Sequence, residues 1–270
     1  MTEFSPAGCV LPHPEFQRHI VVSGGEVLCS EQGPLHNTLP VRFPSEVKDE
    51  IACHYLGEWQ GDSCGVHYLP IRVDIPGYEW RGLRSLLGAV EEPLFFLVGR
   101  AMQVVNWDLD HQYCGRCGIR TLYHSRDRAR VCEHCALVVY PRISPCVIML
   151  VTRGNECLLA RHARHRNAMY TALAGFIEPG ENAEQALARE VYEEVGLETG
   201  AVRYVGSQSW PFPGQLMIGY LAEAVGGTLM PDRDEIAEAR WFHRDEIPAT
   251  IPPLETLSGQ LIRTFIEHSG

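Results

Sequence analysis

The sequence contains almost no lysine and no long apolar segment. Lys48 is the only lysine among 23 basic residues in a chain of 270. No run of about 18 apolar residues occurs, so no membrane-spanning helix is expected. The N-terminus, Met-Thr-Glu-Phe-Ser-Pro, lacks a basic stretch followed by an apolar one, so we expect no signal peptide and a cytoplasmic protein.

Positive charge as a whole is also scarce. The chain has 34 acidic residues against 23 basic ones, which gives a formal net charge of −11. Because phosphate affinity comes largely from Lys and Arg, any contact with nucleic acid should be local and directed at an end. The apolar content of 45% excludes a disordered chain, and the length allows two domains, or one domain and a small module.

The ten cysteines divide into two groups. Four have the spacing Cys114-x2-Cys117-x14-Cys132-x2-Cys135, and the other six show no pairing pattern. In a reducing compartment, two C-x-x-C turns are typical of a closed tetrahedral sulfur site that suits Zn²⁺. Four thiolates leave no open coordination position, so we expect this zinc to be structural. A redox dithiol is the alternative.

The remaining sequence predicts mixed α and β structure, because strand-like and helix-like patterns alternate along it. The first 108 residues carry a strand-like run at 66–73 and a partly helical stretch at 83–105. Later residues predict strands, an acidic helix or turn that begins near Asp234, and two helices. The strands are expected at 146–151, 157–160, 170–178, 202–209 and 215–224, and the helices at 183–195 and 255–268.

The helix predicted at 183–195 carries three glutamates on one face. Asn182 and Gln185 have the spacing of a capping box, and Gly196 is placed to end the helix. At about 100° per residue, Glu190, Glu193 and Glu194 fall within one arc of roughly 100°. The adjacent apolar stripe consists of Leu187, Val191 and Val195.

Carboxylates crowded in this way repel one another, a cost that divalent cations would relieve. Oxygen-rich clusters select Mg²⁺ or Mn²⁺. Arg189 can pair with Glu181 and hold the preceding loop on the helix. A solvated acidic face is the alternative interpretation of the three glutamates.

Residues 175–197 match every specified position of G-x5-E-x7-R-E-U-x-E-E-x-G-U, where U is aliphatic. This pattern is the Nudix box, so the chain resembles the Nudix hydrolases, which cleave nucleoside diphosphates linked to another group. Residues 207–215, Ser-Gln-Ser-Trp-Pro-Phe-Pro-Gly-Gln, resemble the S-Q-P-W-P-F-P-x-S array of the NADH pyrophosphatase subfamily, whose members also remove NAD caps from RNA. Ser209 and Gln215 depart from that array.

The resemblance implies an α/β (α+β) chain with three domains. An N-terminal Nudix-like α+β domain would span 1–108, a zinc ribbon with one Zn²⁺ per subunit would span 109–141, and a catalytic Nudix α/β/α sandwich would span 142–270. It further implies a homodimer with active sites shared across the interface. The implied reaction is metal-dependent hydrolysis of NADH or NAD⁺ to AMP and nicotinamide mononucleotide, and of the NAD cap at an RNA 5′ end to leave a 5′-monophosphate.

Residue roles follow from the same resemblance. Glu194 is expected to be the most rate-critical carboxylate, with Glu190 as a second and Glu193 assisting. The catalytic Mg²⁺ or Mn²⁺ is expected to bind Glu190, Glu194, Glu235 and the Ala174 carbonyl. Phe176 should stack on nicotinamide, and Tyr140 should reach a substrate, which could lie in the partner subunit. The other expected substrate contacts are Arg84, Asp127, Gln208, Ser209, Trp210, Pro211, Phe212, Pro213, Gly214, Gln215 and Ser258.

Two rival functions stay open. The first is hydrolysis of another dinucleotide, such as ADP-ribose or a diadenosine polyphosphate. The second is a non-catalytic Nudix-fold regulator that uses its zinc ribbon to bind nucleic acid or protein. The aromatic rings among the prolines of 207–215 could stack on a flat ligand or simply pack.

Overall fold

The computed structural model describes residues 4–6, 16–39, 53–163 and 169–267, and it divides the chain into two compact units. The first unit runs from Met1 to Arg142 and the second from Ile143 to Gly270. None of the helices in the described ranges is both long and apolar enough to cross a membrane.

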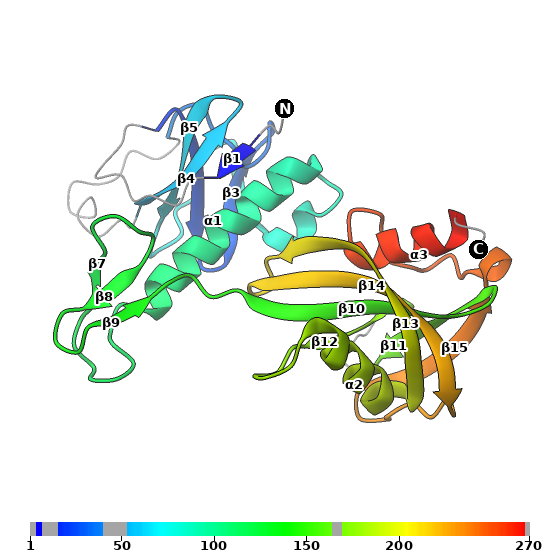
Figure 1. The fold of residues 1–270 in the computed structure, drawn as a ribbon. Coiled ribbons are helices and arrows are strands. Elements are labelled where there is room, and N and C mark those ends of the chain that lie inside the picture. The colour runs from blue at the N-terminus through cyan, green and yellow to red at the C-terminus, as the bar shows by residue number, and fades with distance from the viewer. Residues whose placement is uncertain (1–3, 7–15, 40–52, 164–168, 268–270) are drawn as a thin grey trace. The chain divides into compact units, whose positions relative to one another are not determined.

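The first unit is built on a six-stranded sheet whose strands lie in the order β1-β4-β5-β2-β3-β6 (Figure 1). Helix α1 (Glu92–Asp110) packs against β2, β4 and β5. The strands are β1 (Phe4–Pro6), β2 (Arg18–Ser23), β3 (Glu26–Ser30), β4 (Cys53–Trp59), β5 (Asp62–Tyr68) and β6 (Tyr78–Gly82), and a 3-10 turn covers Leu83–Leu86. The expected strand at 66–73 is therefore wrong in its second half, because β5 ends at Tyr68.

A small three-stranded sheet follows α1 and carries the four spaced cysteines. Its strands are β7 (Leu122–Tyr123), β8 (Arg130–Cys132) and β9 (Leu137–Val139). Asp108 of α1 joins this sheet to the rest of the unit. Its carboxylate accepts hydrogen bonds from Arg130 Nε at 2.7 Å and from the Tyr123 hydroxyl at 2.9 Å, and His54 Nε2 of β4 lies 3.4 Å away.

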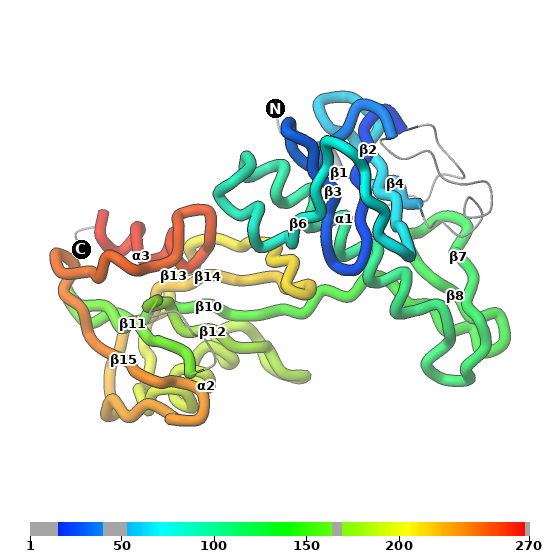
Figure 2. The backbone as a smooth tube through the Cα atoms, turned by 180° about the vertical axis from the view of Figure 1, so that it is seen from behind, coloured from blue at the N-terminus to red at the C-terminus, as the bar shows by residue number. Residues whose placement is uncertain are grey.

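The second unit is an α/β/α sandwich. Its sheet has the order β13-β14-β10-β11-β15, β12 pairs with β10, and β10 runs parallel to β14. Figure 2 shows this sheet from behind, with α3 on one side and α2 on the other. The elements are β10 (Ser144–Arg153), β11 (Glu156–His162), β12 (Leu173–Phe176), α2 (Ala183–Val195), β13 (Leu197–Trp210), β14 (Gln215–Gly227), β15 (Ile236–His243), a 3-10 turn (Arg244–Glu246) and α3 (Leu257–Glu267).

Alternation along β10 explains the two layers. Val147, Met149 and Val151 join the core under α2, whereas Cys146, Ile148 and Leu150 join the core under α3. The helix predicted at 183–195 is confirmed to the residue. The turn expected near Asp234 is present, but it leads into β15, a strand that the sequence pattern did not predict. Helix α3 begins two residues later than expected, and the predicted end at His268 lies outside the described residues.

Candidate active site

Helix α2 is fixed at both ends by its own sequence. The Asn182 side chain accepts a hydrogen bond from Gln185 N at 2.8 Å, and Gln185 Oε1 accepts one from Asn182 N at 3.0 Å, which completes the predicted capping box. Gly196 ends the helix with φ at 72°, a left-handed conformation that glycine adopts without strain. The predicted apolar stripe of α2 is fully buried. Both ends and the buried stripe therefore fix the direction of the glutamate face.

The three glutamates of α2 differ in their exposure. Glu194 is only 3% exposed, and its Oε2 has no hydrogen-bond partner among the described residues. Burial, reinforced by the negative charges of Glu190, Glu235 and Glu193, raises the pKa of Glu194 to about 8. Burial also raises the pKa of Glu190, although hydrogen bonds from Arg189 oppose the shift. Glu193 lies at the exposed edge of the face, with 59% of its side chain accessible.

Arg189 connects the glutamate face to the loop before α2. Its guanidinium donates to both carboxylate oxygens of Glu181, at 2.6 and 2.9 Å, which confirms the predicted pair. It also donates to Glu190 at 2.8 Å, to Glu193 at 2.9 Å and to the backbone oxygen of Phe176 at 3.0 Å. The hydrogen bonds that Glu181 accepts from Arg189, and one from Glu178 N, lower the pKa of Glu181 to about 2. One planar cation thus holds the loop and two carboxylates in a fixed arrangement.

Strand β12 lies against the carboxylate of Glu190. A Cβ built on Gly175 would overlap the Glu190 carboxyl group, so only glycine allows this approach. Ala174 precedes Gly175 and pairs with Ile148 of β10. The structure therefore places the Ala174 residue beside the position at which Glu190 meets the sheet.

Glu235 joins the cluster from the turn before β15. Asp232 N donates to the backbone oxygen of Glu194 at 2.9 Å, and Glu235 N donates to Asp232 O at 3.2 Å. The charge of Glu235 contributes to the raised pKa of both Glu190 and Glu194. The structure thus gathers carboxylates from two elements that are about 40 residues apart in the sequence.

The expected nicotinamide contacts extend along one row of the sheet. Gln208 of β13 pairs with Met217, Met217 pairs with Cys146, and Cys146 pairs with Phe176 of β12. Phe176 is 48% exposed, so its ring is available to a ligand. Ser209 and Trp210 end β13, the turn that follows contains Pro211, Phe212, Pro213 and Gly214, and Gln215 begins β14 opposite Trp210.

The rings of the predicted aromatic array contact each other. Trp210 and Phe212 meet edge to face, with centroids 5.1 Å apart, and Trp210 also packs on the α3-side core. The array is therefore partly a packing feature, as the sequence allowed. Ser258, another expected substrate contact, opens α3 and accepts a hydrogen bond from Ala172 N at 3.1 Å. Sequence reasoning missed that partner, because it lies 86 residues away along the chain.

Three of the expected substrate contacts belong to the first unit. The Tyr140 hydroxyl donates to Asp127 Oδ2 at 3.2 Å, and this hydrogen bond raises the pKa of Tyr140. Tyr140 is 55% exposed. Arg84 is exposed in the 3-10 turn after β6. The structure thus brings Tyr140 and Asp127 together.

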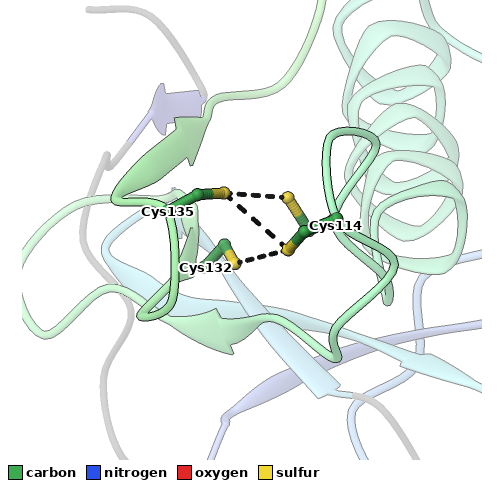
Figure 3. A group of neighbouring side chains, drawn as sticks. Cys114, Cys132 and Cys135 are labelled. Atoms are coloured by element: carbon green, nitrogen blue, oxygen red, sulfur yellow. Dashed lines mark hydrogen bonds between the residues drawn. The ribbon is translucent and has the colours of Figure 1, made fainter.

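The four spaced cysteines converge. Figure 3 labels three of them, Cys114, Cys132 and Cys135, whose side chains point toward one another. Sγ of Cys114 lies 3.4 Å from that of Cys135, and Sγ of Cys117 lies 3.4 Å from that of Cys132 and 3.8 Å from that of Cys135. All four sulfurs lie within 4.8 Å of one another. In the described part of the chain, no other group of three or more His, Cys, Asp or Glu side chains has its ligand atoms that close together. The glutamates therefore stand farther apart than the cysteines.

Comparison with known proteins separates the chain into three matched segments. Residues 17–107 match the NADH pyrophosphatase-like rudimentary NUDIX domain, residues 109–140 the NADH pyrophosphatase zinc ribbon domain, and residues 141–265 the NUDIX domain. A protein of Pseudomonas syringae pv. syringae, named NAD-capped RNA hydrolase NudC, is 44% identical over 92% of this chain and 91% of its own length. The chain belongs to the NADH pyrophosphatase subfamily of Nudix hydrolases.

Two further similarities involve this subfamily and the wider Nudix group. A Stutzerimonas stutzeri protein that carries the same name is 43% identical, over 78% of this chain and 76% of its own length. The crystal structure of a NUDIX hydrolase from Nitrosomonas europaea is 24% identical, with a TM-score of 0.49 over 58% of this chain and 91% of that one.

A Nudix hydrolase requires a divalent cation, and the residues of the carboxylate cluster fit one. The buried Oε2 of Glu194 has no partner among the described residues, although a buried carboxylate without one is costly. The charges of Glu190 and Glu235 help to raise the pKa of Glu194, so their carboxylate oxygens are the other candidate donors. Hard divalent cations prefer such oxygen donors.

The zinc ribbon of this Nudix hydrolase also fits its metal. Zn–S bonds of about 2.3 Å place the corners of a tetrahedron about 3.8 Å apart. The sulfur separations of 3.4 and 3.8 Å agree with that geometry. Without the metal, a backbone hydrogen bond from Arg116 N contributes most to lowering the pKa of Cys114 to about 6, whereas the hydrogen bond with Cys114 contributes most to raising the pKa of Cys135 to about 12. The site is a structural zinc site.

Proposed function

We propose that this chain hydrolyses the pyrophosphate bond of NADH or NAD⁺, giving AMP and nicotinamide mononucleotide. We extend the proposal to RNA whose 5′ end carries NAD, which would leave a 5′-monophosphate. The cation is Mg²⁺ or Mn²⁺, held by Glu190, Glu194, Glu235 and the carbonyl of Ala174. The names of the relatives, which are NAD-capped RNA hydrolases, support this substrate class.

One observation carries the proposed site: the buried Oε2 of Glu194 has no hydrogen-bond partner among the described residues, and the charges of Glu190 and Glu235 act on the same carboxyl group. When bound, a divalent cation would polarise the phosphate oxygens and stabilise the charge that develops on them. A bound cation would also favour the ionised form of Glu194, whose carboxylate then accepts a proton from the attacking water, while the water oxygen bonds to one phosphorus and the bridging P–O bond breaks. Glu193 assists from the exposed edge, where its carboxylate is held by Arg189.

The substrate's nicotinamide half is assigned to the sheet end that carries Phe176. The Phe176 ring is half exposed and would stack on nicotinamide. The pocket would also be lined by Ser209, Trp210, Pro211, Phe212, Pro213, Gly214 and Gln215. Gln208 and Ser258 belong to the same region. Arg84, Asp127 and Tyr140 are proposed to contact substrate as well, with Tyr140 reaching the site of the partner subunit in a cytoplasmic homodimer. The proposed domain boundaries are 1–108, 109–141 and 142–270.

The decisive experiment incubates the purified protein with NADH and NAD⁺, and with Mg²⁺ or Mn²⁺, and then separates the products. Glu194→Gln is run in parallel, with Glu184→Gln as the matched control, because Glu184 is exposed in the first turn of the same helix. AMP and nicotinamide mononucleotide should form with the wild type and the control, and not with Glu194→Gln.

A substrate panel separates the proposal from its rivals. ADP-ribose and diadenosine polyphosphates test other dinucleotides, and an NAD-capped RNA beside its triphosphate form tests decapping. Faster cleavage of ADP-ribose than of either nicotinamide dinucleotide would overturn the substrate assignment. RNA binding without any turnover would favour the regulator. Light scattering coupled to gel filtration tests the homodimer.

A further inference from the structure

Both polar atoms of the Gln208 side chain contact the chain just before and at the start of α3. Gln208 Nε2 donates to the backbone oxygen of Glu255 at 2.7 Å, and Leu257 N donates to Gln208 Oε1 at 2.8 Å. Because a backbone oxygen only accepts and a backbone N–H only donates, these partners fix the orientation of the amide. Gln208 is 8% exposed, so little of its side chain is left for a ligand.

These contacts help to set where α3 begins. The first backbone N–H groups of a helix have no partner within the helix and need acceptors from elsewhere. Gln208 satisfies Leu257 N, and the Thr256 hydroxyl satisfies Gly259 N at 3.1 Å. Gly259 fits against Pro253 O, where a Cβ would collide. The first turn of α3 is thus held in one position from several sides.

Ser258 links the first turn of α3 to the residue before β12. Its hydroxyl oxygen accepts a hydrogen bond from Ala172 N at 3.1 Å, and both residues are buried. Ala172 directly precedes β12, whose four residues include Ala174 and Phe176. On the opposite face of the sheet, β12 meets Glu190, and the Phe176 carbonyl meets Arg189. The short strand is therefore fixed from the α2 side and from the α3 side.

We infer that Gln208 and Ser258 are positioning residues, which act in series through the start of α3 to hold β12 in place. Gln208 sets the first turn of α3, Ser258 transmits that position to Ala172, and β12 then presents the Ala174 carbonyl and the Phe176 ring. The inference rests on the proposed function where it concerns catalysis, and it replaces direct substrate contact as the role of these two side chains.

The test uses three variants and a matched control in the full-length, zinc-loaded protein. Gln208→Met removes both hydrogen bonds at similar size. Gln208→Glu keeps the acceptor for Leu257 N but places a carboxylate against Glu255 O. Ser258→Ala removes the acceptor for Ala172 N. Gln260→Glu introduces the same charge one turn along α3, at a side chain for which the described residues show no hydrogen-bond partner.

Amide hydrogen exchange without substrate gives a readout that does not depend on catalysis. Gln208→Met and Gln208→Glu should lower the protection of both Leu257 and Ala172 at pH 8, whereas Ser258→Ala should lower that of Ala172 alone. Near pH 5 the introduced carboxyl group of Gln208→Glu can be protonated and can donate to Glu255 O, so protection should return towards the wild-type value. Gln208→Met should show no such recovery, and Gln260→Glu should match the wild type throughout.

Kinetics and Mn²⁺ binding complete the test. A displaced β12 should lower kcat about tenfold to a hundredfold, because misplaced groups cost rate. Any rise in KM should accompany that fall, because β12 also carries the Phe176 ring. Mn²⁺ affinity, measured by the electron spin resonance of the free ion, should fall in the same variants. If KM rises while kcat and both amide protections stay unchanged, Gln208 is a substrate ligand and the inference is wrong. If no dinucleotide is cleaved but the amide protections change as expected, the proposed function is wrong, whereas the structural link from Gln208 through Ser258 to Ala172 is confirmed.

Discussion

The carboxyl group of Glu190 occupies the space that a side chain at Gly175 would need. The two residues belong to different elements, β12 and α2, so the glycine sets how closely the glutamate face can approach the sheet. This steric relationship explains why Gly175, the first position of the Nudix box, is glycine. It also means that a single methyl group can move the Glu190 carboxylate without disturbing the hydrophobic core.

Gly175→Ala should therefore lower activity far more than stability. The added Cβ meets the end of a flexible side chain, which can rotate away, so we expect the melting temperature to fall by only a few degrees. Hydrolysis should fall by about a hundredfold, because displaced groups contribute little to catalysis. The matched control is Gly206→Ala, where a Cβ would have no neighbour within 4 Å among the residues that the structure describes. Comparable losses of activity in both variants would contradict the steric explanation.

The raised pKa of Glu194 gives the metal-free protein a defined pH dependence. Its pKa is about 8 in the folded state against an ordinary value of 4.5, so between these values the folded protein binds more protons than the unfolded one. The contribution of Glu194 to the free energy of unfolding must then fall as pH rises from about 5 to 8, by an amount on the order of a few kcal/mol. Glu194→Gln should abolish that fall and be more stable than the wild type at pH 8.

Urea unfolding at pH 5 and pH 8 in the presence of excess Mg²⁺ chelator measures this difference, with zinc retention checked for each sample. Glu184→Gln is the control, because this glutamate is exposed on the same helix. If wild type and Glu194→Gln differ in stability by the same amount at both pH values, the pKa of Glu194 is not raised by burial.

The planar shape of Arg189, and not only its charge, should matter. Its guanidinium reaches three carboxylates and the Phe176 carbonyl, a set that a lysine ammonium cannot contact at once. We expect Arg189→Lys to lower kcat about tenfold or more, since Glu181, Glu190 and the loop lose their common partner. Arg263→Lys is the matched control, because Arg263 forms a single exposed pair with Glu267. Steady-state kinetics test this prediction. An unchanged kcat in Arg189→Lys would show that only the positive charge of Arg189 matters, and not the shape of its guanidinium.

What the sequence predicts well is local. The span, capping box and terminal glycine of α2 depend on residues within a few positions of one another, and the zinc ligands come from two short turns. The strand β15 escaped prediction because its burial does not alternate regularly and its partner, β11, lies far earlier in the chain. Its position as the edge neighbour of β11 is a tertiary property.

The partners of individual polar residues could not be predicted for the same reason. Gln208 bonds to backbone groups 47 and 49 residues away, and nothing in its own neighbourhood indicates them. The buried set around Asp108 joins residues of four elements, and the helical pattern alone gives Asp108 no partner. Sequence patterns therefore predict which segments contain the site residues. Packing determines which of their polar groups face a ligand and which bond to the protein itself.

That buried set makes Asp108 a strong candidate for a stability role. Its side chain is 1% exposed, and Arg130, beside zinc ligand Cys132, donates to Asp108 Oδ1 at 2.7 and 2.6 Å. Burial tends to raise the pKa of Asp108, but hydrogen bonds and charge from His54 and Arg130 outweigh it and lower that pKa. A lowered pKa means that this stabilisation is present above the unfolded pKa of about 4 and is lost as pH falls through the folded value.

Asp108→Asn should therefore destabilise the first unit by about 3–5 kcal/mol, because it leaves the Arg130 charge buried without its counter-charge. Asp110→Asn is the control, since Asp110 is exposed at the end of the same helix. Urea unfolding gives the free energy, and zinc release to a chromogenic chelator reports on the ribbon. Because Arg130 lies two residues before Cys132, zinc should leave Asp108→Asn faster than it leaves the control. Equal stability and equal zinc release would mean that the ribbon is held by its metal alone.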